Sequence, residues 1–258
     1  MAVKALFIMP GGELTLEKAF LIGGMHGGAK FTVPIIMALV VCDEGNILFD
    51  TGLHSGGVQD PLGTWSERAI RLCAPHLREE DGIENKLEEI GINLKDVHYV
   101  VDSHLHWDHC GGNRLFTQSK ILVQRAEYRF AHYPDSYAQA SFLKNHFDLP
   151  DLHYELVEGD KKIFDGVHIL LTNGHTPGHQ SLLVKLKKTG TIILPGDAIP
   201  TRENLEKNLL PGPVWSAEGA YHSLLRLKDI AQRENGQIFL SHDAEFAKTS
   251  KKSPAFYE

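Results

Sequence analysis

The most informative stretch of this 258-residue sequence reads Ser103-His104-Leu105-His106-Trp107-Asp108-His109. It follows residues 97–101, a short run of β-branched and apolar side chains that predicts a strand. Side chains two positions apart share one face of an extended backbone, so His104 and His106 are expected side by side. A lone histidine is more often structural, but three imidazoles and a carboxylate packed this closely need a metal or other partners. Because borderline divalent metals prefer such ligands, the stretch predicts a metal centre at a strand end.

Further candidate ligands follow later predicted strands. His175 comes directly after residues 167–171, Asp197 follows 191–194, and His242 follows 237–240. Loops at the ends of a rigid sheet are where functional side chains are commonly presented. Taken singly, Asp197 is equally well a turn residue and His242 a helix cap or surface group. Together with the first cluster they supply enough ligands for two metal ions.

The rest of the chain alternates short strands with amphipathic helices. Strands are predicted at residues 3–8, 33–42, 47–49, 97–101, 121–123, 154–157, 167–171, 181–186, 191–194 and 237–240. Helices are predicted at residues 65–77, 82–90, 127–147 with a break at Pro134, and 216–232. Strands followed by helix in both halves predict an α/β fold with packed sheets covered by helices. No change in composition marks a boundary, so residues 1–258 are expected to form one domain.

The charge balance and the cysteines indicate which partners and which cellular compartment to expect. The 26 basic and 33 acidic residues give a formal net charge of -7, which argues against nucleic acid as a partner. The pairs Lys161-Lys162, Lys187-Lys188 and Lys251-Lys252 are expected in solvated turns. No apolar run approaches the roughly 20 residues of a membrane span, and the N-terminus lacks a signal-peptide pattern. Three cysteines without CxxC spacing predict free thiols, so the cytoplasm is the expected location.

The order of these ligands resembles the metallo-β-lactamase superfamily, whose HxHxDH motif is followed by a distant His, a bridging Asp and a final His. The resemblance runs from Asp50-Thr51-Gly52 to His242. It implies an αββα sandwich with the metals at one edge of the paired sheets. The stretches SHLHWDHCGGN (103–113), NGHTPGHQSL (173–182) and GDAIPTRENLE (196–206) are most similar to the N-acyl homoserine lactonases, which act in quorum quenching.

This resemblance also implies a ligand set. The first metal would be held by His104, His106 and His175, and the second by Asp108, His109 and His242, with Asp197 bridging both. His179 and Asp50 would support the site without binding metal. Two divalent ions are therefore expected as cofactors. Zinc is the first choice, and the nitrogen and oxygen ligands leave iron, cobalt and manganese open.

The implied reaction is hydrolysis of an uncharged lactone. Two metals lower the pKa of a bridging water to about 7, and the resulting hydroxide attacks the lactone carbonyl. Asp108 is the candidate catalytic residue, accepting and returning a proton. The sequence departs from many such lactonases at Pro200, where they have a substrate-contacting tyrosine; Tyr221 is one candidate replacement. The residues named for an acyl pocket, with core or lid packing as the alternative for each, are Phe20, Leu21, Met25 and Trp107.

Other functions stay open at this stage. A different hydrolase of the same superfamily, acting on esters, thioesters or organophosphates, is the main alternative to a lactonase. An iron-dependent redox protein or a non-catalytic, metal-stabilised binding protein is the alternative from another class. The expected partner is a small-molecule lactone, with neither nucleic acid nor membrane, and a homodimer is left open.

Overall fold

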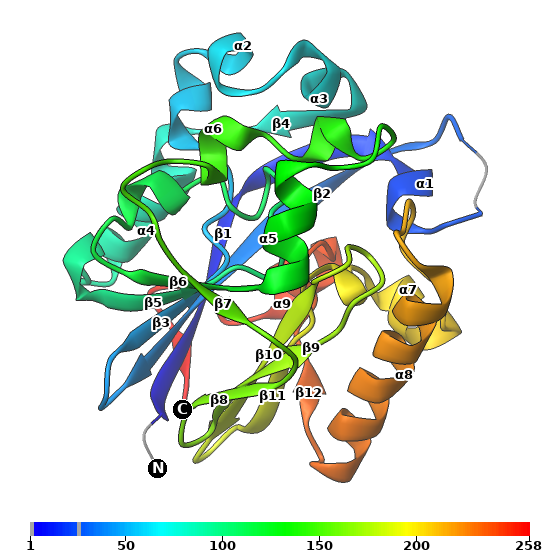
Figure 1. Ribbon diagram of the computed structural model, residues 1–258. Helices are drawn as coiled ribbons and strands as arrows, with labels where there is room; N and C mark the ends of the chain where they lie inside the picture. The colour runs from blue at the N-terminus through cyan, green and yellow to red at the C-terminus, as the bar shows by residue number, and fades with distance from the viewer. Residues whose placement is uncertain (1–2, 25–26) are drawn as a thin grey trace.

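Two β-sheets pack face to face and carry helices on their outer surfaces in the computed structural model of the chain (Figure 1). The structure describes residues 3–24 and 27–258. The layers follow the order helix, sheet, sheet, helix. The predicted αββα fold class is therefore confirmed.

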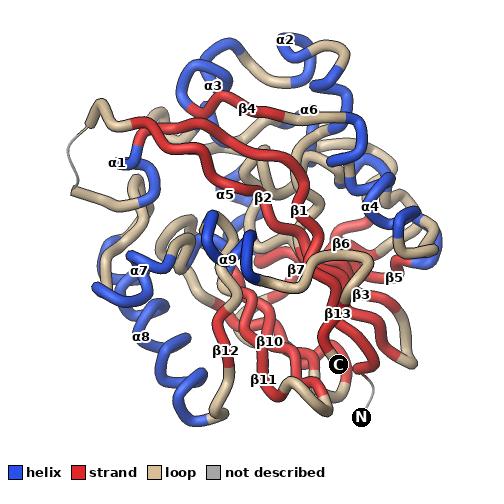
Figure 2. The backbone as a smooth tube through the Cα atoms, turned by 180° about the vertical axis from the view of Figure 1, so that it is seen from behind, coloured by secondary structure: helices blue, strands red, loops and turns tan. Residues whose placement is uncertain are grey.

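The larger sheet has eight strands within the described residues. In spatial order they are β13 (Phe256–Tyr257), β1 (Val3–Glu17), β2 (Lys30–Cys42), β3 (Asn46–Phe49), β5 (Val97–Val101), β6 (Lys120–Gln124) and β7 (His153–Val157), with β4 (Cys73–His76) paired to β1. Strands β1 to β3 are antiparallel, and β3, β5, β6 and β7 are parallel. Seen from behind, β1, β2 and β4 extend beyond the other strands toward α2 and α3 (Figure 2).

The smaller sheet has five strands in the part of the chain described. Their order is β12 (Gln237–Ile238), β11 (Gly190–Leu194), β10 (Gln180–Leu186), β9 (Val167–Leu171) and β8 (Lys161–Phe164). Neighbours are antiparallel except for β11 and β12, which run parallel.

The main core lies between the two sheets. Leu6 and Val40 of the larger sheet and Leu182 and Ile192 of the smaller one are fully buried there. Strand β2 also buries its opposite face, where Met37 and Leu39 meet a second apolar cluster under the helices. Burial on both faces explains why this strand is a continuous apolar run rather than an alternating one.

Helices cover both outer faces. On the larger sheet, α4 (Ile83–Glu89) buries Ile83 and Leu87. On the smaller sheet, α8 (Ala217–Arg233) buries Leu224 and Leu227. The other helices are α1 (Lys18–Leu21), α2 (Pro61–Thr64), α3 (Glu67–Leu72), α5 (Arg125–His132), α6 (Lys144–Phe147), α7 (Arg202–Lys207) and α9 (Ala244–Thr249). No described helix is long and apolar enough to cross a bilayer.

Some predicted elements were wrong. The helix predicted at 65–77 ends at Leu72, and Cys73–His76 forms β4, because these residues pair with 13–16 of β1. The last predicted strand, at residues 237–240, ends at Ile238. The break predicted at Pro134 within 127–147 is confirmed, because α5 ends at His132 and α6 begins at Lys144. The Lys161-Lys162 pair lies in β8 rather than in a turn, and Lys161 forms an ion pair with Glu155 of β7 in the other sheet. The pairing of β4 with β1 joins residues distant in sequence, which local patterns do not reveal.

Candidate metal centre

The seven predicted ligands lie together at one edge of the sandwich. Each comes from a segment that follows a strand. His104, His106, Asp108 and His109 follow β5, His175 follows β9, Asp197 follows β11 and His242 follows β12. The sheets thus present residues from position 104 to position 242 to one small volume.

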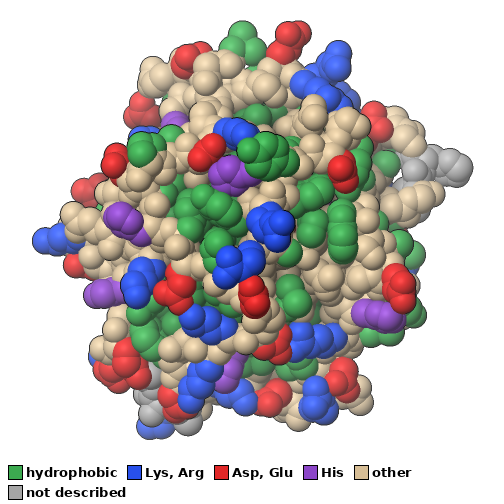
Figure 3. All heavy atoms as spheres, viewed as in Figure 1, with side chains coloured by type: hydrophobic (Ala, Val, Ile, Leu, Met, Phe, Trp, Pro, Cys, Tyr) green, Lys and Arg blue, Asp and Glu red, His purple; other side chains and the backbone are tan. Residues whose placement is uncertain are grey.

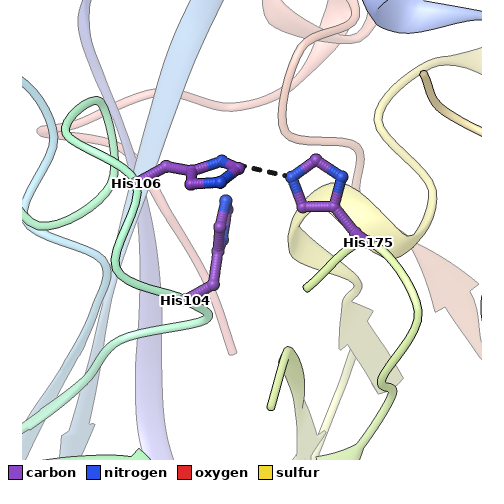
Figure 4. A group of neighbouring side chains, drawn as sticks. All are labelled: His104, His106 and His175. Atoms are coloured by element: carbon purple, nitrogen blue, oxygen red, sulfur yellow. Dashed lines mark hydrogen bonds between the residues drawn. The ribbon is translucent and has the colours of Figure 1, made fainter. Parts of the chain in front are cut away.

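One group consists of His104, His106 and His175. Their nitrogen atoms lie within 4.8 Å of one another. The Nδ1 atom of His106 is 3.3 Å from Nε2 of His175, and the ring centroids of His104 and His106 are 4.3 Å apart. Figure 4 shows the three rings pointing toward one another. Three imidazole nitrogens converging in this way make the type of site that borderline divalent ions occupy.

A second group consists of Asp108, His109 and His242, again with ligand atoms within 4.8 Å. The Oδ2 atom of Asp108 is 3.5 Å from Nε2 of His109 and 3.9 Å from Nε2 of His242. One carboxylate and two imidazoles again suit a divalent ion.

Asp197 lies between the two groups. Its Oδ1 atom is 3.0 Å from Nε2 of His242 and 3.5 Å from Nε2 of His109. Its Oδ2 atom is 3.5 Å from Nε2 of His175. Each oxygen of a single carboxylate therefore faces a different group, which is the arrangement expected of a bridging ligand.

The hydrogen bonds behind the rings fix which nitrogen faces the centre. Nδ1 of His109 donates to Oδ2 of Asp50 at 2.8 Å, and Nδ1 of His242 donates to the carbonyl oxygen of Pro34 at 2.9 Å. In the neutral form of each ring, Nε2 therefore keeps a lone pair directed at the cluster. The buried Nε2 atoms of His104 and His109 have no hydrogen-bond partner. Uncompensated buried nitrogens of this kind fit a pair of divalent cations.

The pKa values of the histidines differ between the two groups of candidate ligands. Burial lowers the pKa of His104 and of His106 well below the ordinary value, so both rings are neutral, as metal ligands must be. Burial also disfavours charge on His109, but Asp108, Asp197 and Asp50 outweigh it and raise the pKa of His109 to about 10. The negative charge that draws a proton to this ring would equally stabilise a metal cation.

His179 is placed differently from the seven. Its Nε2 accepts the backbone N–H of Asp197 at 3.0 Å, and its Nδ1 is 2.9 Å from Oγ1 of Thr172. Both ring nitrogens are thus engaged within the protein, and His179 belongs to neither group. Pro200 is buried, and its carbonyl oxygen accepts the backbone N–H of His242 at 3.0 Å.

A cavity of about 90 Å³ opens beside the cluster. Its walls are mainly apolar and include Leu16, Phe20, Leu21 and Trp107, so three of the four residues named for an acyl pocket line it. The fourth, Met25, is outside the described residues. Tyr221 is half-exposed on α8 and is not among the described residues that line this cavity.

Glu127 is a buried residue of the site that the sequence did not reveal. It lies in the first turn of α5, and its carboxylate accepts the backbone N–H groups of Leu105 and Gly178, each at 3.1 Å. Burial raises its pKa to about 7, while the two N–H donors favour the charged form. No motif pointed to it, because its position depends on how α5 packs against two distant loops.

Comparison with known proteins agrees with this geometry. The family model of the metallo-beta-lactamase superfamily matches residues 33–242. The chain is 36% identical to an N-acyl homoserine lactonase of Bacillus cereus, covering 99% of this chain and 100% of the relative. It is 30% identical to the lactonase AttM of Rhizobium radiobacter, covering 98% of each.

A solved structure extends the similarity to three dimensions. An N-acyl homoserine lactone hydrolase with N-hexanoyl-L-homoserine, its product, at the catalytic metal centre superposes with a TM-score of 0.90. The two sequences are 34% identical, and the match covers 100% of both chains.

Proposed function

Because this chain belongs to the metallo-beta-lactamase superfamily, we propose that it is a dinuclear metal-dependent hydrolase that opens the lactone ring of N-acyl homoserine lactones. The observation that carries the proposal is the Asp197 carboxylate, whose two oxygens face two separate groups of ligands. The full-length similarity to lactonases supports the choice of substrate. A mainly apolar cavity beside the cluster suits an acyl chain.

In this proposal His104, His106 and His175 hold one ion, and Asp108, His109 and His242 hold the other, with Asp197 shared. When bound, the two ions supply an activated water near neutral pH and polarise the lactone carbonyl. Zinc is the metal proposed first, and iron, cobalt or manganese suits the same ligands.

The chain's own residues position the substrate and move the proton. Leu16, Phe20 and Trp107 offer apolar walls that hold the acyl chain and exclude bulk water from the reacting carbonyl. Asp108 turns Oδ2 toward His109, and its second oxygen takes up the proton lost by the attacking water. The proton is returned to the ring oxygen as the acyl carbon–oxygen bond breaks. Water is thus added across that bond, giving a carboxylate, a free hydroxyl and one released proton.

The surface fits an uncharged substrate. Lys and Arg side chains are interspersed with Asp and Glu on the face seen in Figure 3. A polyanionic partner would need a concentrated basic surface. The cysteines Cys42, Cys73 and Cys110 are free thiols, which supports a place in the reducing cytoplasm. A homodimer remains a prediction, to be checked by light scattering of the purified protein.

The test is proton release by zinc-loaded protein with N-hexanoyl homoserine lactone, a simple γ-lactone, a thioester and a phosphotriester. We expect fast opening of the acyl lactone. Turnover of the thioester or phosphotriester alone would refute lactone hydrolysis and favour another hydrolase of the superfamily. One iron per chain with no hydrolysis would favour redox chemistry instead.

Asp197→Asn should lose metal and lactonase activity together, because the bridge contacts both groups. Asp102→Asn is the matched control. Asp102 is a fully buried aspartate near the cluster, and it accepts a hydrogen bond from Nδ2 of Asn113 at 2.7 Å. Burial raises its pKa well above the ordinary value, so the neutral amide resembles the native group. An active Asp197→Asn variant that retains both ions would show that the bridge is misassigned.

A further inference from the structure

Glu127 connects the two loops that carry the first group of histidines. Its Oε1 accepts the N–H of Leu105 and its Oε2 accepts the N–H of Gly178, both at 3.1 Å. The side chain is fully buried. Helix α5, which carries it, stands near the edge where the two sheets meet (Figure 1). Each oxygen of this carboxylate therefore serves a different loop.

The two loops belong to different sheets. Leu105 lies between His104 and His106, in the segment that follows β5 of the larger sheet. Gly178 lies three residues after His175, in the segment that follows β9 of the smaller sheet. One buried side chain thus holds the two loops that carry His104, His106 and His175 at a fixed separation.

The packing at this contact is tight. A Cβ atom on Gly178 would lie 2.3 Å from the backbone nitrogen of Glu127, which is closer than real Cβ contacts allow. Only glycine lets the loop approach α5 this closely. Without the carboxylate, the N–H groups of Leu105 and Gly178 would be buried donors with no acceptor, so the loops would shift to find new partners.

We propose that Glu127 is a positioning residue for the first metal ion, setting the separation of His106 and His175 through the backbone of their loops. This inference rests on the proposed function only in requiring that the histidine group binds metal. Nδ1 of His106 and Nε2 of His175 are already 3.3 Å apart, so a small shift of either loop changes the ligand geometry. Partners that orient metal ligands typically contribute 10–100-fold to metal affinity.

The test uses the full-length protein and Co²⁺, whose visible absorption reports ligand geometry. Glu127→Gln keeps the volume but replaces one acceptor oxygen with an NH₂ group, so only one loop can be held. We expect Co²⁺ titration against a chelator to show one of the two ions weakened about 10–100-fold, with a changed visible spectrum. The other ion should keep its affinity.

Leu87→Ala is the control for general destabilisation. Leu87 is fully buried on α4, in the cluster outside the larger sheet, and should keep both ions despite a loss of stability. Should Glu127→Gln not fold, Glu127→Asp keeps the charge but is too short to hold both loops, and the same selective loss is expected.

Two results would overturn the proposal. One is a folded Glu127 variant with both cobalt affinities and the spectrum unchanged. The other is an equal loss of cobalt from Leu87→Ala, which would reduce the role of Glu127 to general stability. Wild-type protein that binds two cobalt ions but opens no lactone would refute the proposed function alone, because the role of Glu127 is measured from metal binding.

Discussion

Replacing Asp50 with asparagine tests whether one carboxylate sets the tautomer of His109. The side chain of Asp50 is buried and accepts the N–H of Ser103 at 2.6 Å and Nδ1–H of His109 at 2.8 Å. In Asp50→Asn one oxygen becomes an NH₂ group. If the remaining oxygen keeps the Ser103 bond, His109 can only accept at Nδ1, and its hydrogen moves to Nε2. That hydrogen would then occupy the position facing Asp108 and Asp197.

The size of the effect follows from this geometry. Loss of a group that orients a metal-binding histidine costs about 10–100-fold in metal affinity, or about 1.4–2.8 kcal/mol. The lost charge-assisted hydrogen bond should also lower the free energy of unfolding of the metal-free protein by about 1.5–3 kcal/mol. We expect the loss to fall on the ion held by Asp108, His109 and His242, in contrast to the Glu127 variants.

The assay is competition for Zn²⁺ with a fluorescent chelator, together with urea unfolding of the metal-free protein. Asp102→Asn again provides the control, since its carboxyl group bonds Asn113 rather than a histidine. An Asp50→Asn variant with both zinc affinities intact would show that the tautomer of His109 does not depend on Asp50.

Three other substitutions probe the pH response, the core and the loop packing. Burial lowers the pKa of His146 to about 4, against about 6.5 when unfolded, so the free energy of unfolding falls as pH drops through this window. His146→Gln should remove about 3 kcal/mol of that decrease in urea titrations at pH 7 and pH 4; an unchanged slope would exclude His146 as its source. Leu182→Ala, in the core between the sheets, should lower the free energy of unfolding by about 2–5 kcal/mol in chemical denaturation; a loss below 1 kcal/mol, on the order of a surface change, would contradict this packing. Gly178→Ala should weaken the first cobalt ion about tenfold or more, because its Cβ would displace the loop from Glu127. Unchanged cobalt binding there would mean that the loop has room to adjust.

The grouping of the seven candidate ligands could be largely predicted from the sequence, because they are contiguous or follow recognisable strands. Four of the seven lie between His104 and His109, directly after an apolar strand that the structure contains. The other three each follow a predicted strand. Local hydrophobic patterning locates strand ends well, so it also locates the side chains that those ends carry.

The residues that support the candidate ligands could not be predicted from the sequence in this way. Glu127 contacts Leu105 and Gly178 only because α5 packs over loops from both sheets, and nothing in its sequence neighbourhood signals that. Strand β4 was missed for a related reason. Its pairing with β1 joins residues about 60 positions apart and overrides local helical spacing. The hydrophobic periodicity of the sequence does not reveal tertiary contacts of this kind.

The spread of the candidate ligands along the chain has a consequence for folding kinetics. Residues from position 104 to position 242 meet only after both sheets have formed and packed, so the complete site is absent from an unfolded or half-folded chain. Closing such long loops makes this a late event. Metal should therefore stabilise the native state mainly by slowing its unfolding, and should leave the refolding rate nearly unchanged.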